Sequence, residues 1–127
     1  MPIMFNRFSD GSWGGTSQGV QFFIEDDGGK PNSAQQDLAD HISAGLDAVK
    51  KQASDYLDLF IDRAKAGGCQ NETWFLEEVE MRGLSNSNAR IFKLTFTLTG
   101  DDGGYWDVQF RFGDGAILPF RFGRIQQ

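Results

Sequence analysis

Three groups of acidic residues hold most of the chemistry that this chain could perform. They are the run Glu25-Asp26-Asp27, the glutamates around Glu77, and the pair Asp101-Asp102. Two of these groups precede paired glycines, a pattern typical of tight turns because aspartate and glycine tolerate turn geometry. A calcium loop needs oxygen ligands at alternate positions and a bidentate acid further on, and neither turn has that spacing. We therefore expect no metal and no cofactor, and we take Asp26, Asp27, Asp101 and Asp102 as candidate partner-binding residues.

Glu77 is the acidic residue whose position could support acid–base chemistry. Strict alternation along its strand would point it into the core, where burial raises the pKa of a carboxyl. A β-bulge at Glu77-Glu78 would instead turn Leu76 and Val79 inward and leave both acids outside. We favour the bulge, because the pattern also places no second carboxylate beside Glu77 for general acid–base catalysis. The alternative is a small enzyme or ligand-binding domain that uses Glu77 in a pocket between helix and sheet.

Single copies of the two most reactive residue types limit the remaining chemistry. The chain has one histidine, His41, and one cysteine, Cys69. They cannot supply an internal disulfide, the usual zinc ligand sets, or a triad that needs a second imidazole. No catalytic residue is therefore assigned. Trp13, a large aromatic residue in a polar stretch, either covers the core or stands exposed as an anchor for a partner, and it joins the candidate binding residues.

A long amphipathic helix is the clearest element in the sequence. Ser33 and Gln36 have the spacing of a capping box, which predicts that the helix begins there. Apolar residues then recur every three or four positions, as on the buried face of a helix: Leu38, Ile42, Leu46, Val49, Ala53, Leu57, Phe60 and Ala64. From Ala34 to Ala66 the helix would be about 50 Å long, which exceeds the width of a compact domain of this size. It must therefore bend or break near Ser43-Ala44-Gly45, or overhang the sheet.

Patterns of period two predict strands on both sides of this helix. Two come before it, at Ile3–Phe8 and Val20–Ile24, joined by a loop over Ser9–Gly19. A four-strand meander follows it, at Thr73–Gly83, Arg90–Thr99, Tyr105–Phe112 and Ala116–Arg124. The sequence therefore predicts an α+β fold in the order β-β-α-β-β-β-β. One long helix, straight or kinked, packs on one face of a mostly antiparallel sheet, and residues 1–127 form a single domain.

The alternation of apolar residues also predicts how the strands of the meander pair. Placing apolar residues on one face pairs Phe110 with Leu118 and Val108 with Phe120 across a three-residue loop. In the preceding hairpin it pairs Leu94 with Phe110. On the opposite, polar face, Asp107 lies opposite Arg121, and Glu80 lies opposite Lys93.

Composition and charge indicate which partners are plausible. The 127 residues carry a net charge of −6, with 14 acidic and 6 basic residues in Met1–Met81 but 4 acidic and 6 basic in Arg82–Gln127. This excess of acid disfavours nucleic acid, whose phosphates require lysine and arginine, and would steer a basic protein towards the first part of the chain. The start of the chain lacks a secretory signal pattern and no apolar run is long enough to cross a membrane, so we expect a cytoplasmic protein.

The order of these features resembles small uncharacterised bacterial α+β domains. The residues that carry the resemblance are Trp13-Gly14-Gly15, the strand Val20–Ile24, the helix start from Pro31 to Gln36, and the strand from Tyr105 to Phe110. Some of these domains look like toxin-immunity proteins, which neutralise a toxin by covering its active surface. A helix on a meander is also similar to cystatin-like folds, which likewise include binding proteins. The resemblance implies binding and supplies no catalytic residue.

The uneven charge, the lack of an assigned catalytic residue and the resemblance to these domains together predict a non-enzymatic acidic binding protein. It would be an immunity protein or another inhibitor, and its partner would be a basic protein such as a toxin. Neither nucleic acid nor a membrane is an expected partner. A homodimer formed along the last strand or at the end of the helix is compatible with this function.

Overall fold

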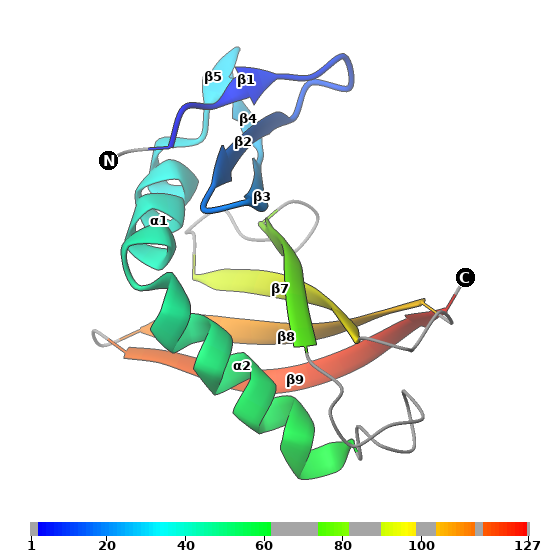
Figure 1. Cartoon of the computed structure of the whole chain (residues 1–127). Coiled ribbons are helices and arrows are strands. Elements are labelled where there is room, and N and C mark those ends of the chain that lie inside the picture. Colours follow the sequence, from blue (N-terminus) through cyan, green and yellow to red (C-terminus); the bar gives the residue numbers. More distant parts are fainter. Residues whose placement is uncertain (1–2, 62–73, 82–89, 99–103, 114–115, 127) are drawn as a thin grey trace.

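A seven-stranded mixed sheet forms the centre of the molecule, with two helices on one side (Figure 1). The computed structural model describes residues 3–61, 74–81, 90–98, 104–113 and 116–126. The strand order in the sheet is β1-β2-β3-β6-β7-β8-β9, and all neighbours are antiparallel except β3 and β6. Two further strands pair only with each other. The strands are β1 (Asn6–Arg7), β2 (Trp13–Ser17), β3 (Val20–Ile24), β4 (Asp26–Asp27), β5 (Lys30–Pro31), β6 (Trp74–Glu80), β7 (Ile91–Leu98), β8 (Gly104–Gly113) and β9 (Ala116–Gln126).

The helical region consists of two helices, α1 (Ser33–Ala44) and α2 (Leu46–Phe60). The expected single long helix on one face of the sheet, in the order β-β-α-β-β-β-β, is therefore wrong. The break falls at Gly45, whose backbone N–H still donates to the carbonyls of His41 and Ile42 at 3.3 and 3.1 Å. Glycine is the residue that an α-helix tolerates least after proline, so Gly45 is its weakest point. The second helix ends before Ile61, which has extended backbone.

The start of α1 is set by Asn32 and not by the expected cap at Ser33. The Asn32 side-chain oxygen accepts a hydrogen bond from the Gln35 backbone N–H at 3.0 Å. Asparagine and serine are similarly good N-caps, so local propensity does not separate them. A tertiary contact does, because the Asn32 N–H donates to the Glu25 carbonyl at 2.9 Å and fixes this residue beside the end of β3.

The segment around Trp13 is a strand and not the loop expected over residues 9–19. Strand β2 pairs with β3 through a turn at Gln18-Gly19, where both residues have positive φ. Two consecutive residues of positive φ are typical of the tight turns that join hairpin strands. The glycines that suggested a loop serve close packing: a Cβ on Gly14 would lie 2.4 Å from the ring of Phe8.

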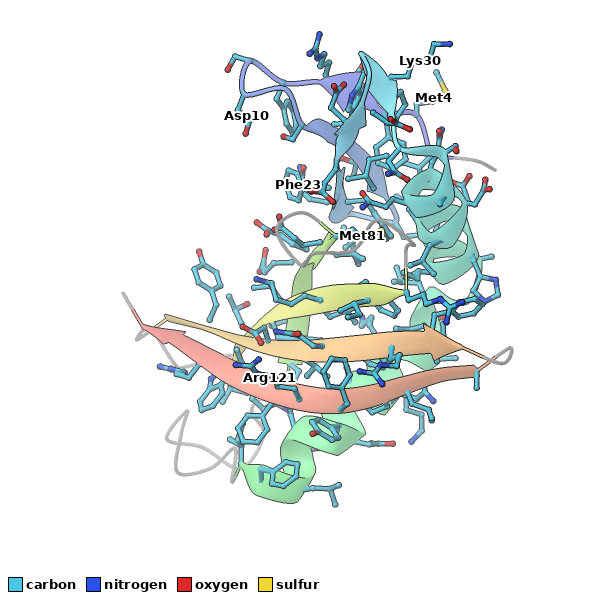
Figure 2. All side chains as sticks on the ribbon, turned by 180° about the vertical axis from the view of Figure 1, so that it is seen from behind. Met4, Asp10, Phe23, Lys30, Met81 and Arg121 are labelled. Carbon is cyan, nitrogen blue, oxygen red and sulfur yellow. The ribbon has the colours of Figure 1, made fainter. Side chains whose placement is uncertain are left out.

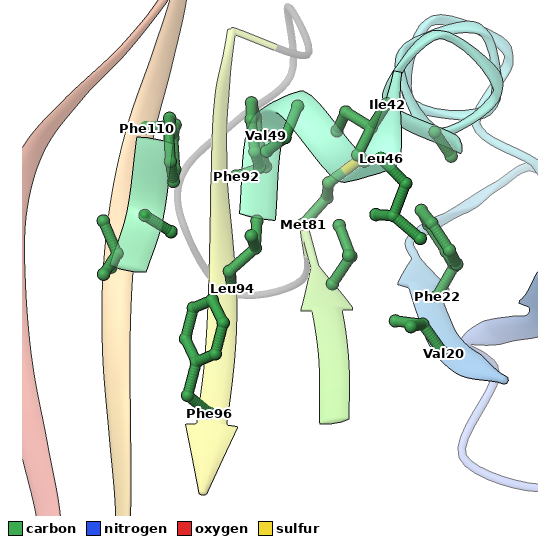
Figure 3. Close-up of a cluster of buried hydrophobic side chains, with 14 of the residues drawn as sticks. Val20, Phe22, Ile42, Leu46, Val49, Met81, Phe92, Leu94, Phe96 and Phe110 are labelled. Carbon is green, nitrogen blue, oxygen red and sulfur yellow. The ribbon is translucent and has the colours of Figure 1, made fainter. Parts of the chain in front are cut away.

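The core lies between the helices and the sheet (Figure 3). The predicted apolar stripe is buried from Leu38 to Leu57, whereas Phe60 is 57% exposed. Phe92 of β7 and Phe110 of β8 stack in parallel beneath the helices, with ring centroids 5.0 Å apart. The apolar face of the meander thus meets the helices as predicted.

The register of the strands agrees with the prediction in part. Glu80 lies opposite Lys93, and the register between β6 and β7 shifts at Glu77 as the predicted bulge requires. Leu94 pairs with Val108 and not with Phe110. The predicted register of β7 and β8 is therefore wrong by two residues, a shift that leaves each side chain on its predicted face because strands alternate with period two.

The predicted pairing of β8 with β9 is wrong as well. Gly113 already pairs with Ala116, and Phe110 lies opposite Pro119. A bulge next to Phe110 then leaves Phe120 without an opposite residue and 42% exposed. Beyond the bulge Asp107 lies opposite Gly123, while Arg121 lies opposite Gln109 and not opposite Asp107.

Candidate functional site

The turn between β4 and β5 brings together two of the candidate binding residues, Trp13 and Asp26. The indole Nε1 of Trp13 donates to Asp26 Oδ1 at 2.9 Å, and the Gly29 backbone N–H donates to Asp26 Oδ2 at 3.1 Å. The guanidinium of Arg7 lies 3.8 Å from Asp26 Oδ1. Gly28 and Gly29 both have positive φ, which glycine adopts without steric cost, so the turn can wrap round the carboxylate.

These contacts determine the charge of Asp26 and the orientation of Trp13. The hydrogen bond from Trp13, followed by that from Gly29, holds the pKa of the Asp26 carboxyl below its usual range, so the group is ionised at neutral pH. Trp13 is partly buried against the hydrophobic core. The indole ring therefore has a fixed orientation with one edge at the surface, and its N–H is already hydrogen-bonded to Asp26.

The remaining candidate residues are placed differently. Asp27 is exposed in β4, next to Asp26. Asp101 and Asp102 lie outside the described residues. The described part of the predicted site is thus one acidic turn that includes Asp26 and Asp27 and is hydrogen-bonded to the indole of Trp13.

The helices carry further exposed carboxylates. Asp37 of α1, together with Asp47 and Asp55 of α2, is exposed. Asp55 is bonded to Lys51 at 2.7 Å, and Asp40 accepts a hydrogen bond from the Ile3 N–H at 2.9 Å. Within residues 3–61 there are nine acidic and four basic side chains, whereas the described strands β6 to β9 and the residues beside them carry four acidic and five basic ones. The acid is therefore concentrated on the N-terminal half and the helices.

The groups considered for catalysis do not form a site. Glu77 is exposed at the bulge, where its Oε1 accepts a hydrogen bond from the Thr97 hydroxyl at 3.0 Å, so it does not enter the space between helix and sheet. His41 is exposed on α1 and packs edge-on against the ring of Phe112. Cys69 lies outside the described residues. Among the side chains that the structure describes, no three His, Cys, Asp or Glu residues gather as metal ligands would.

Two buried polar residues were not predicted from the sequence. Gln35 is fully buried, and its side chain binds both the backbone N–H and the carboxylate of Glu25, at 2.8 and 2.9 Å. Its spacing from Leu38, Ala39 and Ile42 puts it on the buried face of α1, a signal that helical periodicity could have revealed. Asp107 is buried on the far face of the sheet, and this burial raises the pKa of its carboxyl against the opposing effect of Lys93 and Arg121.

Comparison with protein-family models, with curated proteins and with solved structures finds no match for this chain. Neither helix in the described residues is long and apolar enough to cross a membrane. The fold is α+β with a mainly antiparallel sheet.

Proposed function

We propose that this chain is a non-enzymatic binding protein that attaches to a basic protein through its acidic N-terminal half and helices. The observation that carries the proposal is the unequal division of charge, nine acidic to four basic side chains in residues 3–61. Exposed carboxylates on one side of a domain accelerate encounter with a positively charged partner and select against acidic ones. Inhibition of a basic toxin, as an immunity protein does, is the form of this function that the resemblance to such domains favours.

Trp13 gives this surface one fixed aromatic group among its carboxylates. Tryptophan is enriched among the residues that dominate binding energy at protein interfaces. Because the hydrogen bond to Asp26 holds the indole in place, little side-chain entropy would be lost when a partner covers it. We expect the acids to steer the partner and Trp13 to supply apolar contact.

The proposal is tested by capturing the partner with the purified chain and measuring how salt affects the complex. A basic protein encoded beside this chain is the first candidate to express and test directly. We expect a partner of high isoelectric point to be held at about 0.05 M salt and released at about 0.5 M, where charge interactions between exposed groups are screened within a few ångströms.

Charge-neutral variants make the test specific to the acidic surface. Asp37→Asn combined with Asp47→Asn should weaken capture, whereas Glu77→Gln combined with Glu80→Gln removes the same charge from the sheet and should not. An acidic partner, or a basic partner held equally by both double variants, would contradict the proposal.

A further inference from the structure

A groove of about 380 Å³ lies at the tip of the β8–β9 hairpin, away from the acidic surface. Its lining comes from both strands: Arg111, Gly113, Ala116, Leu118, Pro119 and Phe120. Arg111 pairs with Leu118 in the register of the hairpin, so both side chains project from the same face of the sheet. The volume is sufficient for one or two side chains of a bound segment.

The walls of this groove are apolar and open to solvent. Leu118 is 61% exposed and Phe120 is 42% exposed. The bulge beside Phe110 turns Phe120 outward. Without the bulge, Phe120 would lie opposite Phe110 and its ring would face the core. Two neighbouring large apolar side chains on one strand lose solvent-exposed area when a partner covers them, which favours binding.

Arg111 gives the groove its chemical selectivity. The guanidinium carbon lies 5.3 Å from the centre of the Phe120 ring, so the aromatic face holds the cation over the groove. Among the described residues, no carboxylate forms an ion pair with Arg111. A guanidinium presents a planar set of N–H donors that matches a carboxylate in two parallel hydrogen bonds. The groove therefore suits a ligand that joins a carboxylate to apolar groups.

The strand that carries the groove is also an edge of the sheet. β9 is the last strand in the sheet order and spans eleven residues, whereas β1 at the other edge has two. Gln52 of α2 donates to the Ile117 carbonyl at 3.3 Å near the start of β9, and Pro119 lacks an N–H. The strand continues beyond both as Phe120–Gln126. An extended segment can add to such an edge through its main chain and place alternate side chains in pockets.

Charge decides between the possible occupants of this edge. Arg121 projects from the face of the sheet that points away from the helices, the same face as Arg111 (Figure 2). A second copy paired along β9 would contribute its own β9, which holds two arginines and no acidic residue and so offers no carboxylate to Arg111. Nucleic acid is disfavoured by the net charge of −6 and by Glu77, Glu78 and Glu80 on the sheet. A polypeptide segment with one carboxylate supplies an acidic group for Arg111, and its single charge meets much less repulsion than a chain of phosphates does.

We propose that the β9 edge binds an extended segment of a partner protein in which an acidic and an apolar residue lie two positions apart, so that both side chains project from the same face of the segment. Arg111 pairs with an acidic side chain, Leu118 and Phe120 cover an apolar one, and the segment continues along the edge of β9. This surface is separate from the acidic one, so the proposal holds or fails independently of the function proposed above.

The test measures fluorescence anisotropy with a labelled synthetic heptapeptide of threonines that carries glutamate at its third position and valine at its fifth, so that both point to the same face. Two control peptides replace glutamate by lysine, or valine by serine. We expect the first peptide to bind and both controls to bind at least roughly tenfold more weakly, because each lacks one of the two required chemistries. Arg111→Gln and Phe120→Ser should each weaken binding to a similar extent, whereas Lys30→Gln, which removes an equal charge near the N-terminus, should have no effect.

Thermal melting of each variant establishes that it is folded, and both altered side chains lie on the surface. The proposal is overturned if the glutamate–valine peptide does not bind, or if Arg111→Gln binds it as the parent chain does. It is also overturned if a labelled oligothymidine binds more tightly than the peptide. Sedimentation showing a dimer that Phe120→Ser dissociates would instead identify a second copy as the occupant.

Discussion

The two halves of the sheet are held to their surroundings by different kinds of contact. In the N-terminal half, β1 to β3 are short and are tied to α1 by polar groups. The Ser17 and Ser43 hydroxyls lie 2.6 Å apart, and the Gln18 side chain donates to the Ser43 carbonyl at 2.9 Å. Gln35 adds the bonds to Glu25 described above. Each of these contacts joins α1 to the β2–β3 hairpin or to its end.

The C-terminal half relies more on apolar area. Its strands are longer, and their inward residues form an aromatic layer in which Trp74 contacts both Phe96 and Trp106 with ring centroids 6.4 and 6.1 Å apart. The stacked Phe92 and Phe110 lie in the same layer. The short strands thus add several polar contacts to the apolar residues that β3 buries, whereas the long strands pack mainly through aromatic area. Their polar ties to α2 include the bond from Trp74 Nε1 to Asp58 at 3.0 Å and the bond from Gln52 to the Ile117 carbonyl.

Truncation of the aromatic layer should have the largest effect on stability. Phe110→Ala removes a fully buried ring that stacks on Phe92 of β7, and we expect a loss of about 3–5 kcal/mol in the free energy of unfolding. Urea denaturation followed by tryptophan fluorescence measures this loss. Phe120→Ala, on the exposed face, is the matched control and should cost less than about 1 kcal/mol. Equal losses would mean that the layer is not what stabilises this half.

Removal of the polar contact at Gln35 should have the next largest effect. Gln35→Ala leaves the Glu25 N–H without its acceptor in a partly buried position, which costs about 1–3 kcal/mol. Gln36→Ala, one residue along the same helix, should be nearly neutral. Hydrogen exchange gives a second measurement, since the amide of Glu25 should lose protection in the first variant and keep it in the second.

The two perturbed carboxyls should give the two halves opposite responses to pH. Burial raises the pKa of Asp107, so its contribution favours folding below the usual aspartate range and is lost as pH rises through the raised pKa. Asp107→Asn should therefore stabilise the protein at neutral pH relative to acid. Thermal melts across the acidic range measure this, and a variant curve parallel to that of the parent would contradict the assignment.

Asp26 should show the opposite dependence, with the smallest effect because the group is exposed. Its lowered pKa means that its contribution to stability is present above the usual aspartate range and is lost as pH falls through the lowered pKa. Asp26→Asn should slightly destabilise the protein at neutral pH and leave it unchanged in acid. Asp27→Asn provides the control, since it changes the same charge at the adjacent exposed position. A neutral-pH loss equal for both variants would show that the bond to Trp13 is not responsible.

The sequence predicted well those features that follow from the spacing of apolar residues and from the face of the helix or strand on which they lie. The buried stripe from Leu38 to Leu57 and the outward position of Glu77 both follow from which side of an element is apolar, and both agree with the structure. The alternation of apolar residues does not distinguish two registers that differ by two residues, because both place the same side chains on the same face. The predicted partner of Leu94 was wrong for this reason.

Features set by contact between distant segments could not be predicted in the same way. Gly14 suggested a loop because the approach of the Phe8 ring is not visible in the sequence. Asn32 became the cap of α1 through its bond to Glu25. The acidic turn was predicted, but its bond to Trp13 joins residues 13 positions apart and depends on β2 being a strand.

The parallel pairing of β3 with β6 has a consequence for the kinetics of folding. Strands β6 to β9 join sequence neighbours in successive antiparallel pairs, so the chain can find these pairings by local search. β3 ends at Ile24 whereas β6 begins at Trp74, so joining them closes a loop that contains both helices. Closing a long loop costs chain entropy before any contact compensates for it. We therefore expect the meander to form early and the docking of the N-terminal half to limit the rate at which the native sheet is completed.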